Sequence, residues 1–197
     1  YFITKFDPKI TKRNELLEEV ENAIKEKIKL IPQIIDDKIL NFTLSFLKSL
    51  LRTNYFLDQD TISFKIDTKI FGKDLKGLQP NLENFIYHRD FYGVHLRMSK
   101  VSRGGLRWSD RHDDYRQEVK SLMITQEGKN SIIIPDGSKG GFVINKESSE
   151  VTKEYFKEIY SLFINANLDL VDNMVDGKII KNENVVCYDE DDAYFVV

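Results

Sequence analysis

Residues Val101–Val143 read VSRGGLRWSDRHDDYRQEVKSLMITQEGKNSIIIPDGSKGGFV, and the rest of the chain is organised around them. The segment holds two glycine pairs, each beside a cationic residue, in Arg103-Gly104-Gly105 and Lys139-Gly140-Gly141. Glycine has no side chain to keep a ligand away, so such pairs suit places where backbone and a fixed positive charge approach an anion together. The segment therefore predicts a carboxylate-binding and catalytic half-site.

A helix is predicted between the two glycine pairs. Ser109 or Asp110 can cap it, and residues 113–114 place two aspartates in its first turn, where negative charge suits the helix dipole. Gln126 continues its apolar line and Lys129 lies three residues further, so we expect this polar pair to face a pocket or the next element. Its buried face is expected to consist of Tyr115, Val119, Leu122 and Met123.

The residues after this helix predict a buried strand and then a ligand loop. Residues 131–135 (SIIIP) are continuously apolar, as in strands buried on both faces. Residues 136–141 are predicted to turn out of that strand, and ligand loops in open α/β sheets sit at such strand ends.

Two helices and three strands are predicted before the segment. Residues 12–30 carry one apolar stripe, typical of a surface helix. Residues 36–52 are apolar around most of the circumference, so we expect a deeply buried core helix, with a partner surface as the alternative. Residues 61–67 alternate apolar and polar side chains, which predicts a half-buried strand, and residues 84–88 and 92–98 predict two more.

A helix, an acidic loop and a strand are predicted after the segment. Residues 151–168 show the helical spacing of apolar side chains. Asp189–Asp192 form an acidic run, interpreted as a solvated loop, and Ala193–Val197 look like a strand cut partway along. The chain is therefore expected to have an α/β fold, with a mixed sheet of about four to six strands and flanking helices.

Composition excludes several classes of protein. The formal net charge of −3 gives no overall basic signal, so neither nucleic acid nor a membrane is expected as a partner. Cys187 is the single cysteine and cannot form an internal disulfide, which favours a reducing compartment such as the cytoplasm. No apolar run has transmembrane length, we expect no signal peptide, and Tyr1 is not an initiator methionine. We expect a cytoplasmic piece of a longer polypeptide.

The central lysine admits several roles. Lys139 can be a point charge for an anion, a base with a lowered pKa, a Schiff-base nucleophile, or simply a solvated loop residue. Arg103 can grip a carboxylate through a bidentate fork. Arg107 can do the same, but a structural pair with Asp110 or Asp114 is the preferred interpretation.

Motifs for nucleotides and metals are missing. GxxxxGK[ST] and GxGxxG do not occur, so this piece alone is not expected to bind a nucleotide. The three histidines lack metal-ligand spacing, and no metal site is expected.

Three motifs nevertheless follow one another in a recognisable order. RGGLR at residues 103–107, Gln126 with Lys129-Asn130, and GSKGG at residues 137–141 together resemble the substrate domain of glutamate dehydrogenases. The sequences RGGLRWSDR, GSKGGF and DLVDNMVDGK are most similar to the large NAD-specific bacterial type. Similarity in order and spacing extends over nearly the whole chain.

The resemblance implies a role for each motif residue. In the smaller glutamate dehydrogenases the first motif is Lys-Gly-Gly, whose lysine holds the distal carboxylate of glutamate; here Arg103 occupies that position, followed by Gly104 and Gly105. By the same resemblance Gln126 and Lys129 bind the α-carboxylate, and Lys139 is the catalytic lysine. Crowding by other cations favours the neutral amine, which can activate water or help ammonia add to a 2-oxo acid.

The resemblance also implies a domain plan and partners. Residues 1–197 are expected to be a partial substrate-binding domain, with leading helices at 1–55 and an α/β portion at 61–197. The catalytic aspartate and the NAD-binding domain are expected beyond Val197. The implied substrates are L-glutamate, 2-oxoglutarate and ammonia, the implied cofactor is NAD without a metal, and the parent enzyme is expected to be a homo-oligomer.

Two other interpretations remain beside this one. The cationic glycine motifs also suit a non-enzymatic carboxylate- or anion-binding module, and the chain also suits a subunit-assembly module. The fragment alone is expected to be inactive, because the nucleotide-binding domain of the family lies outside it.

Overall fold

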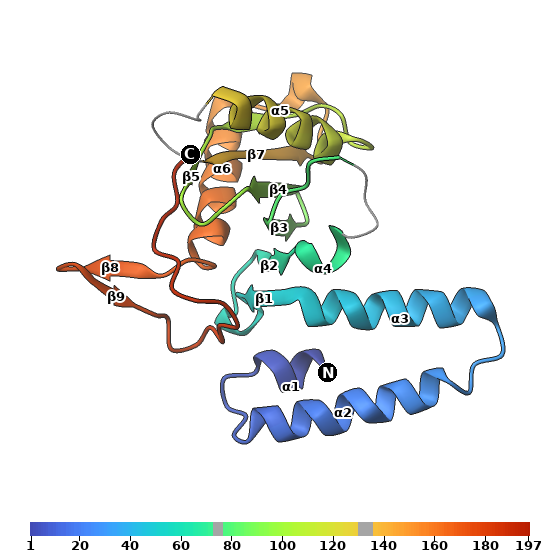
Figure 1. Cartoon of the computed structure of the whole chain (residues 1–197). Helices are drawn as coiled ribbons and strands as arrows, with labels where there is room; N and C mark the ends of the chain where they lie inside the picture. Colours follow the sequence, from blue (N-terminus) through green and yellow to red (C-terminus); the bar gives the residue numbers. More distant parts are fainter. Residues whose placement is uncertain (73–76, 130–135) are drawn as a thin grey trace.

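The computed structural model describes residues 1–72, 77–129 and 136–197 (Figure 1). Within these residues a mixed sheet of seven strands forms the centre, in the order β1-β2-β3-β4-β7-β5, with β6 also paired to β7. The α/β class and the mixed sheet are confirmed, with seven strands in place of the expected four to six. The strands are β1 (Leu50–Thr53), β2 (Ile62–Asp67), β3 (Leu82–His88), β4 (Phe91–Arg97), β5 (Ser102–Arg103), β6 (Leu106–Trp108) and β7 (Asp136–Ile144).

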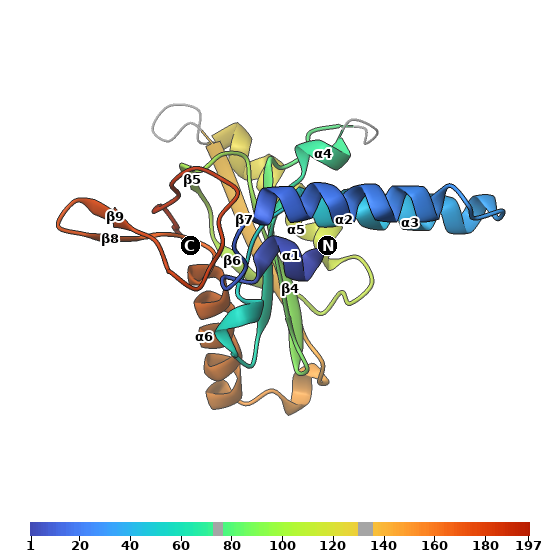
Figure 2. The ribbon, with the colours of Figure 1, turned by 90° about the horizontal axis from the view of Figure 1, so that it is seen from below.

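Two helices cover opposite faces of this sheet (Figures 1 and 2). Helix α5 (Tyr115–Lys129) packs through Val119 and Met123 on one face, and α6 (Lys153–Leu168) packs through Ile159 and Phe163 on the other. Thr152 caps α6, because its side-chain oxygen accepts a hydrogen bond from the Tyr155 backbone N–H. The remaining helices are α1 (Phe2–Phe6), α2 (Arg13–Ile28), α3 (Ile34–Ser49) and α4 (Lys69–Gly72), with 3-10 turns at Tyr55–Leu57 and Ser148–Glu150.

Helices α2 and α3 form a hairpin that extends away from the body of the protein (Figure 2). The predicted helix over 36–52 ends at Ser49, because residues 50–53 pair with β2 as a strand. The prediction of a deeply buried helix was also wrong. Ile39 and Phe42 are 57% and 64% exposed, since only the last turns of α3 reach the body of the protein. Among the described helices, none is long and apolar enough to cross a membrane.

The predicted loop at residues 136–141 is instead the start of β7. This strand joins the antiparallel strands β1 to β4 to the short parallel strands β5 and β6. The glycines allow close packing there. A Cβ on Gly140 would lie 2.3 Å from the Leu106 side chain, and one on Gly141 would lie 2.4 Å from Val119. A glycine-rich sequence can therefore be a strand where neighbouring elements fill the space of the missing side chains. The strand predicted at 131–135 lies outside the described residues.

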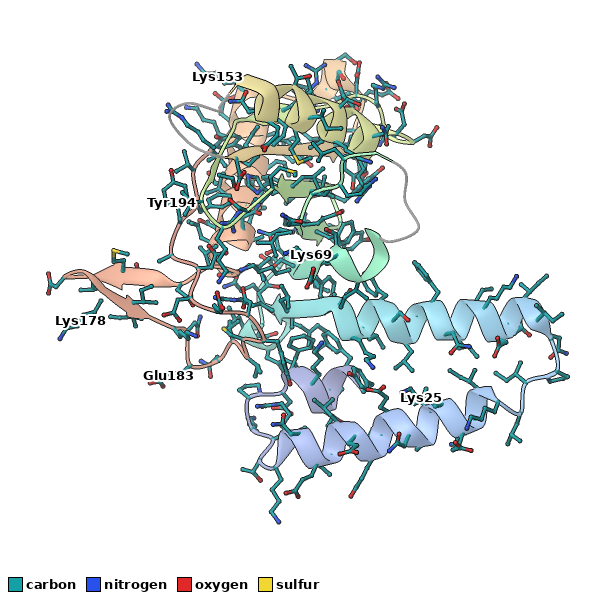
Figure 3. All side chains as sticks on the ribbon, viewed as in Figure 1. Lys25, Lys69, Lys153, Lys178, Glu183 and Tyr194 are labelled. Atoms are coloured by element: carbon teal, nitrogen blue, oxygen red, sulfur yellow. The ribbon has the colours of Figure 1, made fainter. Side chains whose placement is uncertain are left out.

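Two other boundaries differ from the predictions. Helix α5 begins at Tyr115, so Ser109 does not cap it, although the Arg111 backbone N–H donates to the Ser109 hydroxyl at 3.1 Å. Residues 193–197 are irregular and form no strand. Between α6 and this segment, β8 (Asn173–Val175) and β9 (Lys178–Ile180) form a projecting hairpin, with Lys178 near its tip (Figure 3).

The acidic run is not a solvated loop throughout, because part of it enters a buried ion cluster. Asp192 Oδ2 lies 2.7 Å from Arg97 Nη1 and 2.6 Å from Lys65 Nζ, and all three side chains are almost completely buried. Glu190 and Asp191 do stay exposed. We call the following six residues the buried ion cluster: Arg52, Lys65, Arg97, Asp172, Asp189 and Asp192.

This cluster explains why β2 is not the half-buried strand that was predicted. Ser63 and Lys65, on its polar face, are both fully buried. The C-terminal segment covers that face, and Arg97 Nη2 also donates to the backbone oxygen of Tyr194 at 3.0 Å (Figure 3). A buried charge requires partners, and here residues more than 90 positions away supply them.

Candidate functional site

The two glycine motifs lie side by side in neighbouring parallel strands. Arg103 pairs with Gly137, and Leu106 pairs with Gly140. The two partners are separated by the same number of residues in both pairs, so the register continues between them and Gly105 lies opposite Lys139. The Gly140 backbone N–H donates to the Gly105 oxygen at 3.1 Å. The structure thus brings together two motifs that are more than thirty residues apart in the sequence.

Three basic residues from these strands form what we call the cation row: Arg103, Lys139 and Arg107. Each lies opposite a glycine of the neighbouring strand, because Arg103 faces Gly137, Lys139 faces Gly105 and Arg107 faces Gly141. Paired residues point to the same face of a sheet, so all three share the face that α5 covers. Gly105 leaves room for the Lys139 side chain to extend over it, whereas Glu127 and Val119 of α5 lie against Gly137 and Gly141.

Lys139 lies at the centre of this row. Its Nζ is 3.7 Å from the position that a Cβ on Gly105 would occupy, so the amine lies directly over the first glycine motif. The side chain is half-buried, and no carboxylate pairs with it among the described residues. Burial, and then the positive charge of Arg107, lower the pKa of Lys139 below its ordinary value.

Arg107 is held by an acid that sequence reasoning missed. Its Nε lies 2.7 Å from Glu118 Oε1, and the Ser109 hydroxyl donates to Glu118 Oε2 at 2.6 Å. The prediction that Asp110 or Asp114 pairs with Arg107 was wrong. Asp114 pairs instead with Arg111, at the exposed start of the α5 region. Glu118 is on a helix and Arg107 on a strand, so no spacing in the sequence signals their contact.

Gln126 and Lys129 belong to the last turns of α5. The backbone nitrogen of Glu127 would be 2.7 Å from a Cβ on Gly137, so this end of the helix lies against the start of β7, where Lys139 also lies. The Glu127 carboxylate accepts a hydrogen bond from the Gly137 backbone N–H. Gln126 is half-buried, and the side chain of Lys129 lies outside the described part of the structure.

The cation row suits an anionic ligand better than a metal or a phosphate chain. Basic side chains repel metal ions, and the described residues include no group of three or more potential metal ligands. The glycines do not form an open phosphate cradle, because a Cβ on Gly104 would lie 1.7 Å from the Ser138 oxygen and neighbouring strands already fill the space. Exposed cations beside an amine whose pKa is lowered can bind a carboxylate and exchange a proton with it or with water.

A separate cavity of about 710 Å³ lies at the other end of β7. Trp108, His112 and Lys146 are among the residues that line it, and it contains none of the predicted site residues. Trp108 also packs on Phe156, with ring centroids 5.4 Å apart, so it serves both the core and the wall of this cavity. The cation row lies outside this cavity, with Arg103 and Arg107 exposed and Lys139 half-buried.

Comparison with known proteins identifies the family to which the chain belongs. Residues 23–197 match the family described as bacterial NAD-glutamate dehydrogenase, catalytic domain. The chain is 38% identical to an NAD-specific glutamate dehydrogenase of Halomonas elongata over 100% of its own length and 13% of the relative's length. It is also 38% identical to the enzyme of that name from Pseudomonas aeruginosa (91% and 12% covered) and 36% identical to that of Mycobacterium tuberculosis (89% and 12%).

The chain thus spans only a small share of the length of the curated relatives it matches. The family match over residues 23–197 includes every residue of the cation row and all of α5. The chain belongs to the bacterial NAD-glutamate dehydrogenase family, within its catalytic domain.

Proposed function

We propose that this chain is the substrate-binding part of an NAD-dependent glutamate dehydrogenase, which converts L-glutamate to 2-oxoglutarate and ammonia. The names of the relatives support the reaction. The observation that carries the proposal is the cation row, in which Lys139 extends over Gly105 between two arginines. Glutamate carries two carboxylates, and a site with several positive charges and one amine matches that substrate.

The proposed roles follow the positions of the residues. Arg103, with Gly104 and Gly105, binds the distal carboxylate, because a guanidinium can hold a carboxylate through a bidentate fork. Gln126 and Lys129, in the last turns of α5, bind the α-carboxylate. A dicarboxylate bound at both ends is held in one orientation, with its α-carbon beside Lys139.

Lys139 is the proposed general base and acid. Its lowered pKa leaves a larger share of neutral amine than an ordinary lysine has at the same pH. The neutral amine takes a proton from the water that attacks the imine carbon of the oxidised substrate, which gives a carbinolamine. The protonated amine then gives a proton to the carbinolamine nitrogen, so that the C–N bond breaks, ammonia leaves and the 2-oxo acid remains. In the reverse direction the protonated amine returns that proton as ammonia replaces the oxygen.

The two glycine motifs offer no open cradle for the phosphates of a dinucleotide, because side chains and backbone of neighbouring elements lie against Gly104, Gly140 and Gly141. NAD is therefore proposed to bind to another part of the whole protein, and we assign to this chain only substrate binding and the proton transfers at Lys139. Ammonia is proposed as the second product, and the whole protein as a homo-oligomer.

The test is NAD-dependent glutamate oxidation by the whole protein, by its Lys139→Ala variant and by the isolated 197-residue chain. We expect the variant to lose roughly 10²–10⁴-fold in kcat, the usual contribution of a general acid–base group, and the isolated chain to show no turnover. Lys146→Ala, at the far end of β7, is the matched control and should keep full activity. Undiminished turnover in Lys139→Ala would remove the catalytic role, and turnover by the isolated chain would refute the location of the NAD site.

A further inference from the structure

We propose that Arg107 and Glu118 are positioning residues that together set how readily Lys139 releases its proton, with Arg107 favouring the release and Glu118 limiting it. The inference deepens the proposed function and rests on it for its catalytic meaning. The ion pair between Arg107 Nε and Glu118 Oε1, 2.7 Å long, is the observation that carries it.

The geometry keeps the arginine close to the lysine. Arg107 lies opposite Gly141, two positions along β7 from Lys139, and both side chains share one face of the sheet. The Lys139 amine extends over Gly105, which precedes the β6 strand of Arg107, and Val119 of α5 packs on Gly141 beside both side chains. Half of the Arg107 side chain is exposed, and its position therefore depends on the bond to the largely buried Glu118.

Glu118 is itself fixed from the opposite side. The Ser109 hydroxyl donates to Glu118 Oε2 at 2.6 Å, and Ser109 is held because its backbone N–H donates to the Phe142 oxygen at 2.9 Å. The carboxylate therefore has little freedom to follow Arg107 if the arginine moves. A fixed negative charge next to a cation reduces the repulsion that the cation exerts on a second cation nearby.

The other groups around Lys139 do not duplicate this pair. Glu127 on α5 accepts from the Gly137 backbone N–H, Leu96 lies opposite Lys139 on β4, and Arg103 is on β5. Burial and the charge of Arg107 are the causes of the lowered pKa of Lys139. Charge changes at positions 107 and 118 should consequently act on the amine in opposite directions.

The experiment measures the pKa of Lys139 in the 197-residue chain without ligand, from the lysine Cε–Hε NMR signals between pH 7 and 11. Loss of one signal in Lys139→Gln identifies the residue. We expect Arg107→Gln to raise the pKa and Glu118→Gln to lower it, each by on the order of 0.5 pH unit, since glutamine keeps the hydrogen-bond geometry and removes the charge. Arg111→Gln breaks a similar but exposed pair with Asp114 and should leave the pKa unchanged.

The signs of the two shifts decide the outcome. Opposite shifts support the proposal, whereas shifts in the same direction, or no larger than that of Arg111→Gln, overturn it. Backbone amide spectra report whether each variant folds, and if one variant does not, the sign in the other is sufficient. Adding 2-oxoglutarate afterwards tests the proposed function separately, because the ligand-free pKa does not depend on what the site binds.

Discussion

The sheet carries three cations on each of two opposite faces, and the two sets differ in their partners. On the face covered by α6 and the C-terminal segment, the arginines and lysine of the buried ion cluster are matched by three aspartates. On the α5 face, Lys139 of the cation row has no carboxylate partner among the described residues. The same residue types thus serve the fold where acids neutralise them and suit a ligand where they are left partly exposed.

The buried ion cluster should dominate stability. Asp192→Ala leaves Arg97 and Lys65 buried without their shared acid, and we expect it to lower the free energy of unfolding by about 3–5 kcal/mol. Lys139→Met, in the cation row, should change it by less than about 1 kcal/mol, because no ion pair is broken. Urea unfolding at pH 7 measures both, with the exposed Glu190→Ala as control. Equal losses for Asp192→Ala and Lys139→Met would abolish the distinction between the two faces.

A second difference concerns pH. Burial, and then the charge of Arg97, lower the pKa of His95 from 6.5 to about 3, so the folded chain keeps this histidine neutral. Its unfolded form takes up a proton as the pH falls below 6.5, so stability is fully present above that pH and is lost toward pH 3. We expect the free energy of unfolding to fall by up to about 1.4 kcal/mol for each pH unit in this range, and His95→Leu should reduce this dependence. Urea unfolding between pH 7 and 4 measures the slope, and an unchanged slope in His95→Leu would show that another group causes it.

Acid should also weaken the buried ion cluster, in a lower pH range. Burial acts to raise the pKa of Asp192, but the hydrogen bond from Arg97 and the charge of Lys65 outweigh it, and the pKa is lowered. The pKa of Asp172 is likewise lowered, because the bonds from Arg52 and the Asp192 backbone outweigh its burial. The stability from these groups is present above their unfolded pKa near 3.8 and is lost below it, outside most of the range in which His95 acts.

The regular spacing of apolar residues predicted the positions of several strands and helices. Strands β2, β3 and β4 and helix α6 lie close to where apolar spacing placed them. The glycines of β7 were misassigned to a loop, because local turn signals do not reveal that Leu106 and Val119 fill the space beside them. The burial of α3 was mispredicted for the same reason, because an apolar pattern does not show whether another element packs against the helix.

The charged residues were predicted less well than the apolar ones. The motifs identified Lys139 and Arg103 as neighbours in a site, and the register of β5 and β6 with β7 does bring their strands together. The pairs of the buried ion cluster were missed because the partners are distant in sequence, as Arg52 and Asp189 are. Glu118 was missed because it lies on a helix and its partner Arg107 on a strand, so no periodic spacing relates them. Lys65 occupied a polar position in an alternating strand, and only its burial shows that it has a structural role.

The central claim is that the cation row binds a dicarboxylate, and titration of the chain with 2-oxoglutarate tests it most directly. The readouts are the NMR signals of the Lys139 side chain and of the Gly104 and Gly105 amides. We predict saturable shifts at all three, strongly weakened in Arg103→Gln and unaffected by Arg89→Gln, an exposed arginine outside the site. Absence of shifts at Lys139, or equal binding by Arg103→Gln, would contradict the claim.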